Sequence, residues 1–324
     1  MKLKKFASLA TFAFTSALTA PAWAAWPDDK PIEVVVGFAA GGGTDLMARK
    51  LLPFVQKRLG PKVQFVVQNK PGAAGEIANA YVARAQPDGY TLAIVNVPGF
   101  LFVPMTKKSQ YEASDFQLIA RVVDDPTILV TKSDNKTNSF QALMEALKKS
   151  PGALSFGHNG AGTNGDLALQ MLSDATGAKL NEVPYKGTAA QKTDVLGGHL
   201  EFGLVSVGEV PELHGSAATG PLRALVQFGS KRSPALPQVP TAVELGINAV
   251  MTSERGFAAH KGVPAEIIRK LDQAIAESLK DPAFIASASS DAPVLSYLSG
   301  PQWTVSLQQN RKVLEPLAKA APKQ

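Results

Sequence analysis

The feature that most constrains this chain is the repeated alternation of short apolar runs, glycine-rich or proline-rich loops, and segments with helical spacing. The run from Ile32 to Phe38 is almost continuously apolar, which is typical of a strand covered on both faces. The loop Gly41–Asp45 follows it, and apolar residues then recur at helical spacing as far as Gly60. Two further apolar runs, 63–67 and 90–95, flank a second helical segment. This order predicts parallel βαβ units in a doubly wound α/β sheet.

The alternation restarts after residue 115. Extended segments are expected at 116–123 and 127–131, separated by Asp124-Asp125-Pro126. The strands expected beyond this point are 154–157, 182–185, 200–205 and 222–228, and the expected helices are 140–149, 165–175, 189–196, 264–279 and 301–317. The last two helices have no clear strands of their own, so we expect them to pack on the first set. The sequence therefore predicts two α/β lobes, residues 26–125 together with 250–324, and residues 126–249.

Residues 1–24 have the pattern of a secretory signal peptide. Three lysines within the first five residues precede the apolar stretch 6–20, and Ala22-Trp23-Ala24 offers an Ala-x-Ala cleavage site. A membrane anchor is the alternative, but an apolar span needs about 20 residues and this one is shorter. We therefore expect cleavage after Ala24 and export to the periplasm.

Charge and cysteine content exclude several classes of protein. The signal segment carries three lysines and no acid, so its removal lowers the formal net charge from +6 to +3. The remaining bases occur at most in pairs, such as Lys107-Lys108, whereas nucleic-acid binders usually show a basic stripe. No nucleic-acid partner is expected. The absence of cysteine excludes disulfides, thiolate nucleophiles, cysteine-ligated metals and a lipid-modified cysteine.

Two glycine-rich loops are near-duplicates, Phe38–Asp45 and Asn159–Asp166. Each places backbone N–H groups and a threonine hydroxyl, from Thr44 or Thr163, at a helix N-terminus that carries a partial positive charge. Ligands of parallel sheets bind at the carboxyl ends of the strands, where both loops are expected. Two such loops facing across a cleft can hold an anion with two acidic ends. In the alternative interpretation, the two threonines only cap their helices.

Other loops are expected at the same rim, namely Asn96, Lys186-Gly187-Thr188 and Ser206. Lys186 offers a full positive charge to a carboxylate, although it is equally well interpreted as a solvated surface lysine.

Motifs for catalysis and metal binding are missing from the sequence. There is no Gly-x-Ser-x-Gly, no Walker-type Gly-Lys-Ser/Thr and no His-Glu-x-x-His, and the triple glycine departs from Gly-x-Gly-x-x-Gly. The four histidines share no metal-ligand spacing, so no metal and no cofactor is expected. His158 lies beside the second loop and can contact a ligand there. Asp45 and Asp166 are more typical of first-turn acids than of an acid/base pair, yet an exported α/β enzyme remains the alternative function.

Motifs spread over nearly the whole chain resemble those of the tripartite tricarboxylate transporter substrate-binding proteins, the Bug family. The segments that carry the resemblance are Phe38–Asp45, Asn69–Gly75, Pro87–Leu92, Gly160–Thr163, Val183–Gly187, Arg223–Leu225 and Pro237–Gly246. The resemblance implies a monomeric periplasmic receptor of the flytrap type, with two lobes joined by a hinge, that closes on a small organic acid and is not an enzyme. The acid would be a di- or tricarboxylate, an acidic amino acid or an aromatic acid, delivered to integral-membrane transporter subunits.

The family holds a ligand carboxylate mainly through backbone amides and hydroxyls of the two loops. Carried over to this chain, the implied binding residues are Phe38, Ala39, Gly42, Gly43, Thr44 and Asp45 from the first loop, Asn159, Gly160, Ala161, Gly162 and Thr163 from the second, and Lys186, Gly187 and Ser206 in addition. Two segments depart from the family pattern. Asn164-Gly165-Asp166 stands where many members have a histidine, and Val207–Pro211 lacks an expected aspartate. Both departures leave the identity of the acid open.

Overall fold

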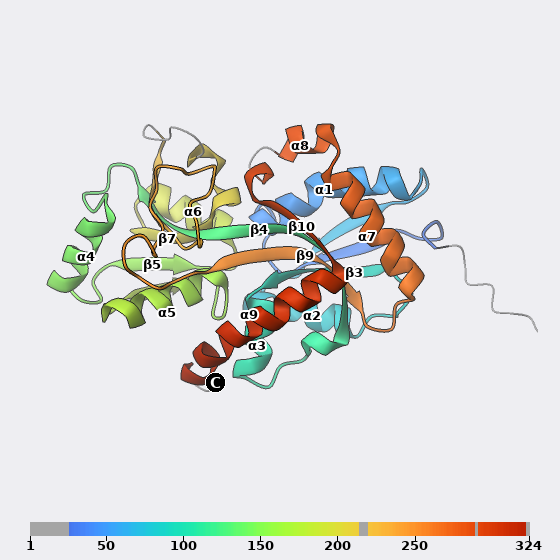
Figure 1. Cartoon of the computed structure of the whole chain (residues 1–324), viewed down its shortest axis with the longest axis horizontal. Helices are drawn as coiled ribbons and strands as arrows, with labels where there is room; N and C mark the ends of the chain where they lie inside the picture. Colours follow the sequence, from blue (N-terminus) through green and yellow to red (C-terminus); the bar gives the residue numbers. More distant parts are fainter. Residues whose placement is uncertain (1–25, 214–219, 289–290, 322–324) are drawn as a thin grey trace, which may run out of the picture.

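The computed structural model describes residues 26–213, 220–288 and 291–321. The expected signal peptide, residues 1–24, lies outside this range. Figure 1 shows an elongated molecule with two α/β halves, and the long strand β4 (Phe116–Lys132) passes from one half into the other. Among the helices described, none is long and apolar enough to cross a membrane.

The first half is built on a mixed sheet. Its strands are β1 (Ile32–Val36), β2 (Phe65–Asn69), β3 (Thr91–Val97), β9 (Thr252–His260), β10 (Leu295–Ser299) and the first part of β4. The order β2-β1-β3 is parallel, as the sequence predicts, and β9 then pairs antiparallel with both β3 and β4. β10 pairs antiparallel with β4 on its other edge.

The second half repeats this plan on a smaller scale. Its strands are β5 (Ser155–His158), β6 (Asn181–Pro184), β7 (Phe202–Ser206), β8 (Leu222–Gln227) and residues 127–132 of β4. β5 is parallel to both β6 and β7, whereas β7 and β8 run antiparallel to β4. The α/β class is confirmed, with antiparallel strands added to the predicted parallel ones.

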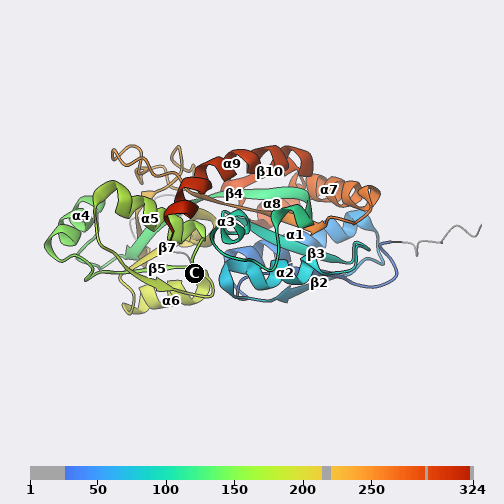
Figure 2. The same ribbon diagram turned by 90° about the horizontal axis from the view of Figure 1, so that it is seen from below.

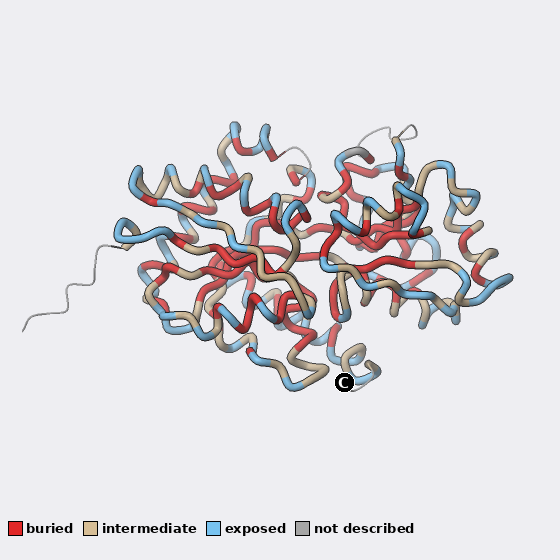
Figure 3. Tube along the Cα trace, turned by 180° about the vertical axis from the view of Figure 1, so that it is seen from behind, coloured by how far each residue is buried: buried red, intermediate tan, exposed pale blue. Residues whose placement is uncertain are grey.

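Helices cover both faces of the strands, which explains the continuous apolar runs. They are α1 (Gly43–Leu59), α2 (Glu76–Ala83), α3 (Gly99–Thr106), α4 (Phe140–Lys149), α5 (Asn164–Thr176), α6 (Thr188–Gly197), α7 (Ala265–Leu279), α8 (Pro282–Ala288) and α9 (Gly300–Ala320). Alternate β1 residues enter different cores: Val34 and Val36 belong to a cluster with α1 and α7, and Val35 belongs to one with α2 and α9. Figure 2 shows helices on both sides of the strands, and Figure 3 shows that the buried residues gather along the middle of each half while the exposed residues lie at the periphery.

The late helices return to the first half. α7 packs against α1, β4 and β10, and α9 packs against α3, β4 and β10. The sequence does not predict α3, α8, β9 or β10.

The prediction of two separate extended segments around Asp124-Asp125-Pro126 is wrong, because β4 continues through this turn-like sequence. Asp125 is fully buried against the Arg255 guanidinium of β9, so its carboxylate is satisfied within the sheet. Pro126 removes only its own donor, and the next residue, Thr127, donates its N–H to the Met251 carbonyl oxygen at 3.1 Å. Tertiary pairing thus overrides a local turn signal.

Candidate functional site

The two glycine-rich loops have the same backbone conformation. Gly41 and Gly162 both have a positive φ, 79° and 81°. The next residues, Gly42 and Thr163, are the N-caps of α1 and α5, with φ/ψ of −77°/165° and −78°/164°. The structural equivalence therefore pairs Thr163 with Gly42 and not with Thr44, two residues away from the pairing that the threonines suggest.

The interpretation that the two threonines merely cap their helices is wrong. Thr44 is the second residue inside α1. Thr163 is an N-cap residue, but no backbone N–H of α5 donates to its side chain, and its hydroxyl instead donates to the Gly160 carbonyl oxygen at 2.7 Å. A third helix, α6, begins after Gly187, which has no side chain to cap it. The first N–H groups of an α-helix have no partner within the helix, so three helices present free donors here.

These three helix N-termini line one narrow cleft between the two halves. Its lining residues are Phe38, Gly42, Gly43, Thr44, Ala74, Asn96, Val97, Pro98, Gly99, Asn159, Thr163, Asn164, Gly187, Thr188, Ser206, Glu209 and Ser253. Eight of the residues implied by the resemblance are therefore brought together: Phe38, Gly42, Gly43, Thr44, Asn159, Thr163, Gly187 and Ser206. Among the described lining residues, Glu209 carries the only charged side chain.

The other implied residues do not line this cleft. Gly160, Ala161, Gly162 and Lys186 line a neighbouring hollow, which Phe38 and Asn159 also reach. The Ala39 N–H donates to the Lys186 carbonyl oxygen at 3.3 Å, which ties the two halves together at the edge of the cleft.

Asp45 is buried below the first loop. Its carboxylate accepts hydrogen bonds from the Gly41 N–H, the Arg49 guanidinium and the Asn69 amide, each at 3.0 Å. Burial opposes ionisation of this group, but the three donors outweigh it and hold the pKa of Asp45 below its ordinary value. Asp45 therefore holds the shape of the loop, and it does not line the cleft.

Two asparagines, one from each half, donate to threonines in the cleft. The Asn96 amide donates to Thr44 Oγ1 at 2.8 Å, and the Asn159 amide donates to Thr188 Oγ1 at 2.9 Å. The amide oxygens of both asparagines are buried and have no hydrogen-bond partner within the protein. Buried acceptors in proteins are usually paired, so these two oxygens suit a donor from water or from a ligand.

Glu209 lies at the second-half side of the cleft and is held by three groups. Its Oε2 accepts from the Thr188 hydroxyl at 3.0 Å and from the Ser206 N–H at 2.9 Å, and its Oε1 lies 3.9 Å from Arg255 Nη1. Arg255 is fully buried and also contacts Asp125. Burial raises the pKa of Asp125, and Arg255 only partly offsets this effect. Sequence reasoning missed this cluster, because β4, β9 and the segment after β7 meet only in the fold.

The N-terminus of α1 packs closely on that cluster. A Cβ placed on Gly43 would lie 2.5 Å from both Arg255 Nη1 and Glu209 Oε1, so any larger residue would have to displace these two side chains. On the opposite edge, a Cβ on Gly99 would lie 3.5 Å from the Gly162 carbonyl oxygen. The two halves thus touch around the cleft.

Solved periplasmic binding proteins share this fold. The periplasmic binding protein BugD superposes with a TM-score of 0.82 at 31% identity, covering 90% of this chain and 97% of that chain. A second structure, described as a periplasmic transporter, gives a TM-score of 0.81 at 30% identity, covering 91% and 98%. The fold is that of periplasmic binding proteins.

Sequence comparison identifies the family. The model of the tripartite tricarboxylate transporter family receptor matches residues 47–314. BugT of Bordetella pertussis is 34% identical over 90% of this chain and 89% of that protein. A UPF0065 protein from the gbd 5' region of Cupriavidus necator is 32% identical, covering 90% and 88%. The chain belongs to the tripartite tricarboxylate transporter receptor family, which confirms the resemblance seen in its motifs.

Proposed function

We propose that this protein binds a small organic acid in the cleft between two lobes, residues 26–125 with 250–324 and residues 126–249. The observation that carries the proposal is the convergence of α1, α5 and α6, whose N-termini all line one cleft without a cationic side chain among the described lining residues. Helix N-termini bind anions through free N–H groups and a partial positive charge.

The arrangement favours an acid with two ends. α1 belongs to the first lobe, whereas α5 and α6 belong to the second, so one carboxylate is bound by each side and closure brings both sides onto the ligand. A ligand that contacts both lobes favours the closed form by its differential affinity for it. An R. palustris protein that was solved with adipate supports a dicarboxylate, since it superposes with a TM-score of 0.82 at 26% identity.

The residues in contact with the acid are proposed to be those that line the cleft. Thr44 and the first N–H groups of α1 bind one carboxylate, and Thr163, Asn164, Gly187 and Thr188 bind the other. The unpaired amide oxygens of Asn96 and Asn159 accept hydrogen bonds from a hydroxyl group of the acid or from water. Phe38 covers the apolar part of the ligand.

In the cell, this receptor is proposed to act in the periplasm as a monomer and to deliver its acid, chemically unchanged, to the membrane subunits of a tripartite tricarboxylate transporter. The family is one of receptors.

A thermal-shift panel of di- and tricarboxylates, acidic amino acids and aromatic acids tests the proposal. Ligand at a hundred times its Kd stabilises a protein by about 2.7 kcal/mol, so a matching acid should raise Tm by roughly 5 °C or more. Thr44→Val should remove most of this shift. Thr193→Val, at an exposed position of α6, is the matched control and should keep it.

Mass spectrometry of the incubated acid separates a receptor from an enzyme. Recovery of the unchanged acid supports binding without turnover. A product of new mass, or a panel without any shift, would overturn the proposal.

A further inference from the structure

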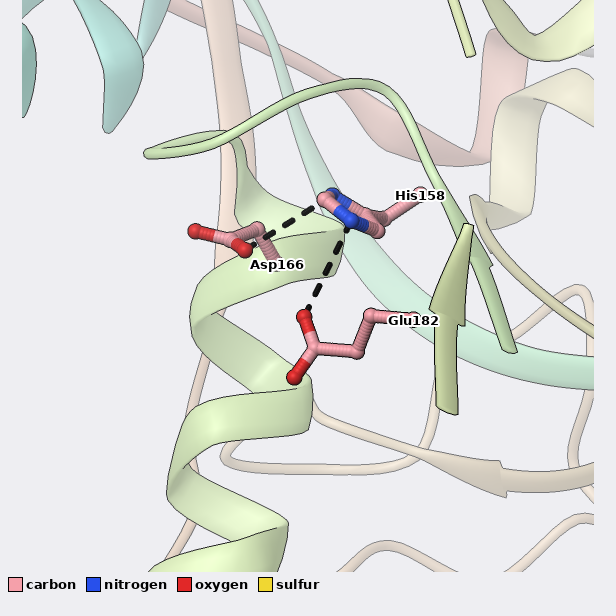
Figure 4. A group of neighbouring side chains, drawn as sticks. All are labelled: His158, Asp166 and Glu182. Atoms are coloured by element: carbon pink, nitrogen blue, oxygen red, sulfur yellow. Dashed lines mark ion pairs between the residues drawn. The ribbon is translucent and has the colours of Figure 1, made fainter. Parts of the chain in front are cut away.

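A second cluster of polar side chains lies outside the cleft, on the face of the second half that α5 covers. His158 is the last residue of β5, Asp166 lies in the first turn of α5, and Glu182 is in β6. Glu182 is paired in register with Phe156, two residues before His158, so the side chains of Glu182 and His158 lie on the same face of the sheet. Figure 4 shows the three side chains facing one another, with the two carboxylates beside each other and both directed at the imidazole.

The distances within this cluster are too long for direct hydrogen bonds but short enough for a shared ion. His158 Nδ1 is 3.7 Å from Asp166 Oδ1, and His158 Nε2 is 3.8 Å from Glu182 Oε2. One ligand atom from each residue can be chosen so that all three lie within 4.8 Å of one another. Two atoms each bound to one Zn²⁺ at about 2.1 Å are at most about 4.2 Å apart, so small side-chain shifts suffice.

The imidazole itself points to a missing partner. The His158 side chain is only 5% exposed, and its Nδ1 has no hydrogen-bond partner in the protein. An unpaired polar atom at such a depth is costly, and native proteins seldom leave one without a partner.

The two carboxylates also need a positive partner. Burial raises the pKa of Asp166, although the Gly162 N–H and His158 partly offset it. Burial likewise raises the pKa of Glu182, and the neighbouring Asp166 carboxylate raises it further. A cation shared by these neighbouring carboxylates, one half-buried and one partly exposed, would relieve their mutual repulsion.

We propose that His158, Asp166 and Glu182 form a binding site for one divalent transition-metal cation of the Zn²⁺ class. One imidazole nitrogen with two carboxylates is a donor set that suits such ions, whereas Mg²⁺ and Ca²⁺ prefer oxygen ligands alone. The Glu182 side chain is 39% exposed, and both acids line the hollow beside the cleft, which gives the ion an entry path and room for a water ligand.

The site connects to the second glycine-rich loop. Asp166 Oδ2 accepts a hydrogen bond from the Gly162 N–H at 2.7 Å, whereas Oδ1 faces His158. A cation on Oδ1 therefore fixes the aspartate that holds this loop. The proposal does not depend on which molecule occupies the cleft.

Calorimetric titration of Zn²⁺ into untagged, chelator-treated protein tests the site. We expect one ion per chain with a Kd in the micromolar range or below, and much weaker binding of Mg²⁺. His158→Gln and Glu182→Gln should each weaken Zn²⁺ binding by more than about tenfold. His199→Gln, at an exposed histidine away from the cluster, is the matched control and should bind as the wild type does.

Circular dichroism checks that each variant is folded. If the variant at the buried His158 does not fold, the result for Glu182→Gln is used alone, because Glu182 is partly exposed and its substitution should not disturb folding. The proposal is overturned if the wild type shows no saturable Zn²⁺ binding, or if a folded Glu182→Gln variant binds as tightly as the wild type.

Discussion

The loops that begin α1 and α5 share a backbone but differ in what their aspartates face. In each, the aspartate accepts a hydrogen bond from the N–H of the positive-φ glycine four residues earlier, Asp45 from Gly41 and Asp166 from Gly162. The remaining oxygen of Asp45 faces Arg49 and Asn69, whereas that of Asp166 faces His158. Beside the first loop, Arg49 supplies a permanent positive charge to Asp45. In the second loop, the ion that we propose would supply this positive charge.

The comparison shows that two loops with the same backbone conformation can be held to different degrees by the side chains packed behind them. In the first lobe the loop is closed off by Arg49 and by tight packing at Gly43. In the second, His158 and Glu182 leave the same aspartate in partly unsatisfied surroundings.

The largest expected effect comes from filling the contact between α1 and the second lobe. In Gly43→Val the added side chain would overlap Glu209 of the second lobe and Arg255 of its own lobe, so the two lobes could not approach as closely as they do in this structure. We expect the affinity for the acid to fall by roughly a hundredfold or more, about 2.7 kcal/mol, as measured by calorimetry.

Gly41→Asn is the control in the same loop. A Cβ there meets nothing within 4 Å, and asparagine tolerates a positive φ. If Gly43→Val bound the acid as tightly as Gly41→Asn does, closure at this contact would not be required.

A smaller effect is expected on the free energy of unfolding when each of the two loop aspartates is substituted in turn. Asp45→Asn places an amide donor among three donors, so we expect a loss of about 1–3 kcal/mol in the free energy of unfolding. Asp166→Asn keeps an acceptor for the Gly162 N–H, and its amide group can donate to the unpaired His158 Nδ1 or to the Glu182 carboxylate. In the presence of a chelator we therefore expect the free energy of unfolding to change by less than about 1 kcal/mol. Urea unfolding of both variants measures the two losses, and equal losses would contradict the comparison.

The smallest effect is the pH dependence of the Asp45 contribution. Because the folded-state pKa of Asp45 is lowered, its stabilisation is complete above the unfolded pKa of about 3.9 and is lost as the pH falls through the folded value. The difference in unfolding free energy between the wild type and Asp45→Asn should stay constant from about pH 7 to about pH 5 and shrink below about pH 4. A difference that persists undiminished to pH 2 would mean that the charge of Asp45 is not its source.

Much of the fold follows from local sequence. The strand β1 could be predicted because burial on both faces requires a run of apolar residues. The start of α1 could be predicted because a glycine-rich loop often precedes a helix N-terminus that binds an anion. β9 leaves no such trace, since it begins Thr252-Ser253-Glu254-Arg255. Its charged residues are buried with partners from other elements, since Glu254 pairs with Arg121 of β4 and Arg255 pairs with Asp125 of β4.

The residues of the candidate site likewise divide into those that sequence motifs identify and those that only the fold brings together. Gly42, Gly43, Thr44, Thr163 and Gly187 lie within motifs, so the resemblance identifies them. Gly99 and Thr188 also line the cleft but lie outside these motifs. Glu209 and Arg255 lie in segments without a pattern, and they meet through tertiary packing alone. His158, Asp166 and Glu182 come from three separate elements with no ligand spacing in the sequence, so only the fold brings them together.

The central claim is that an acid is bound between opposed helix N-termini of the two lobes. A crystal structure with a dicarboxylate that raises Tm tests it most directly. The account predicts one carboxylate within hydrogen-bond distance of the first N–H groups of α1 and of Thr44, and the other at the N-termini of α5 and α6. An acid bound elsewhere, or held chiefly by the Lys186 ammonium outside the cleft, would contradict it.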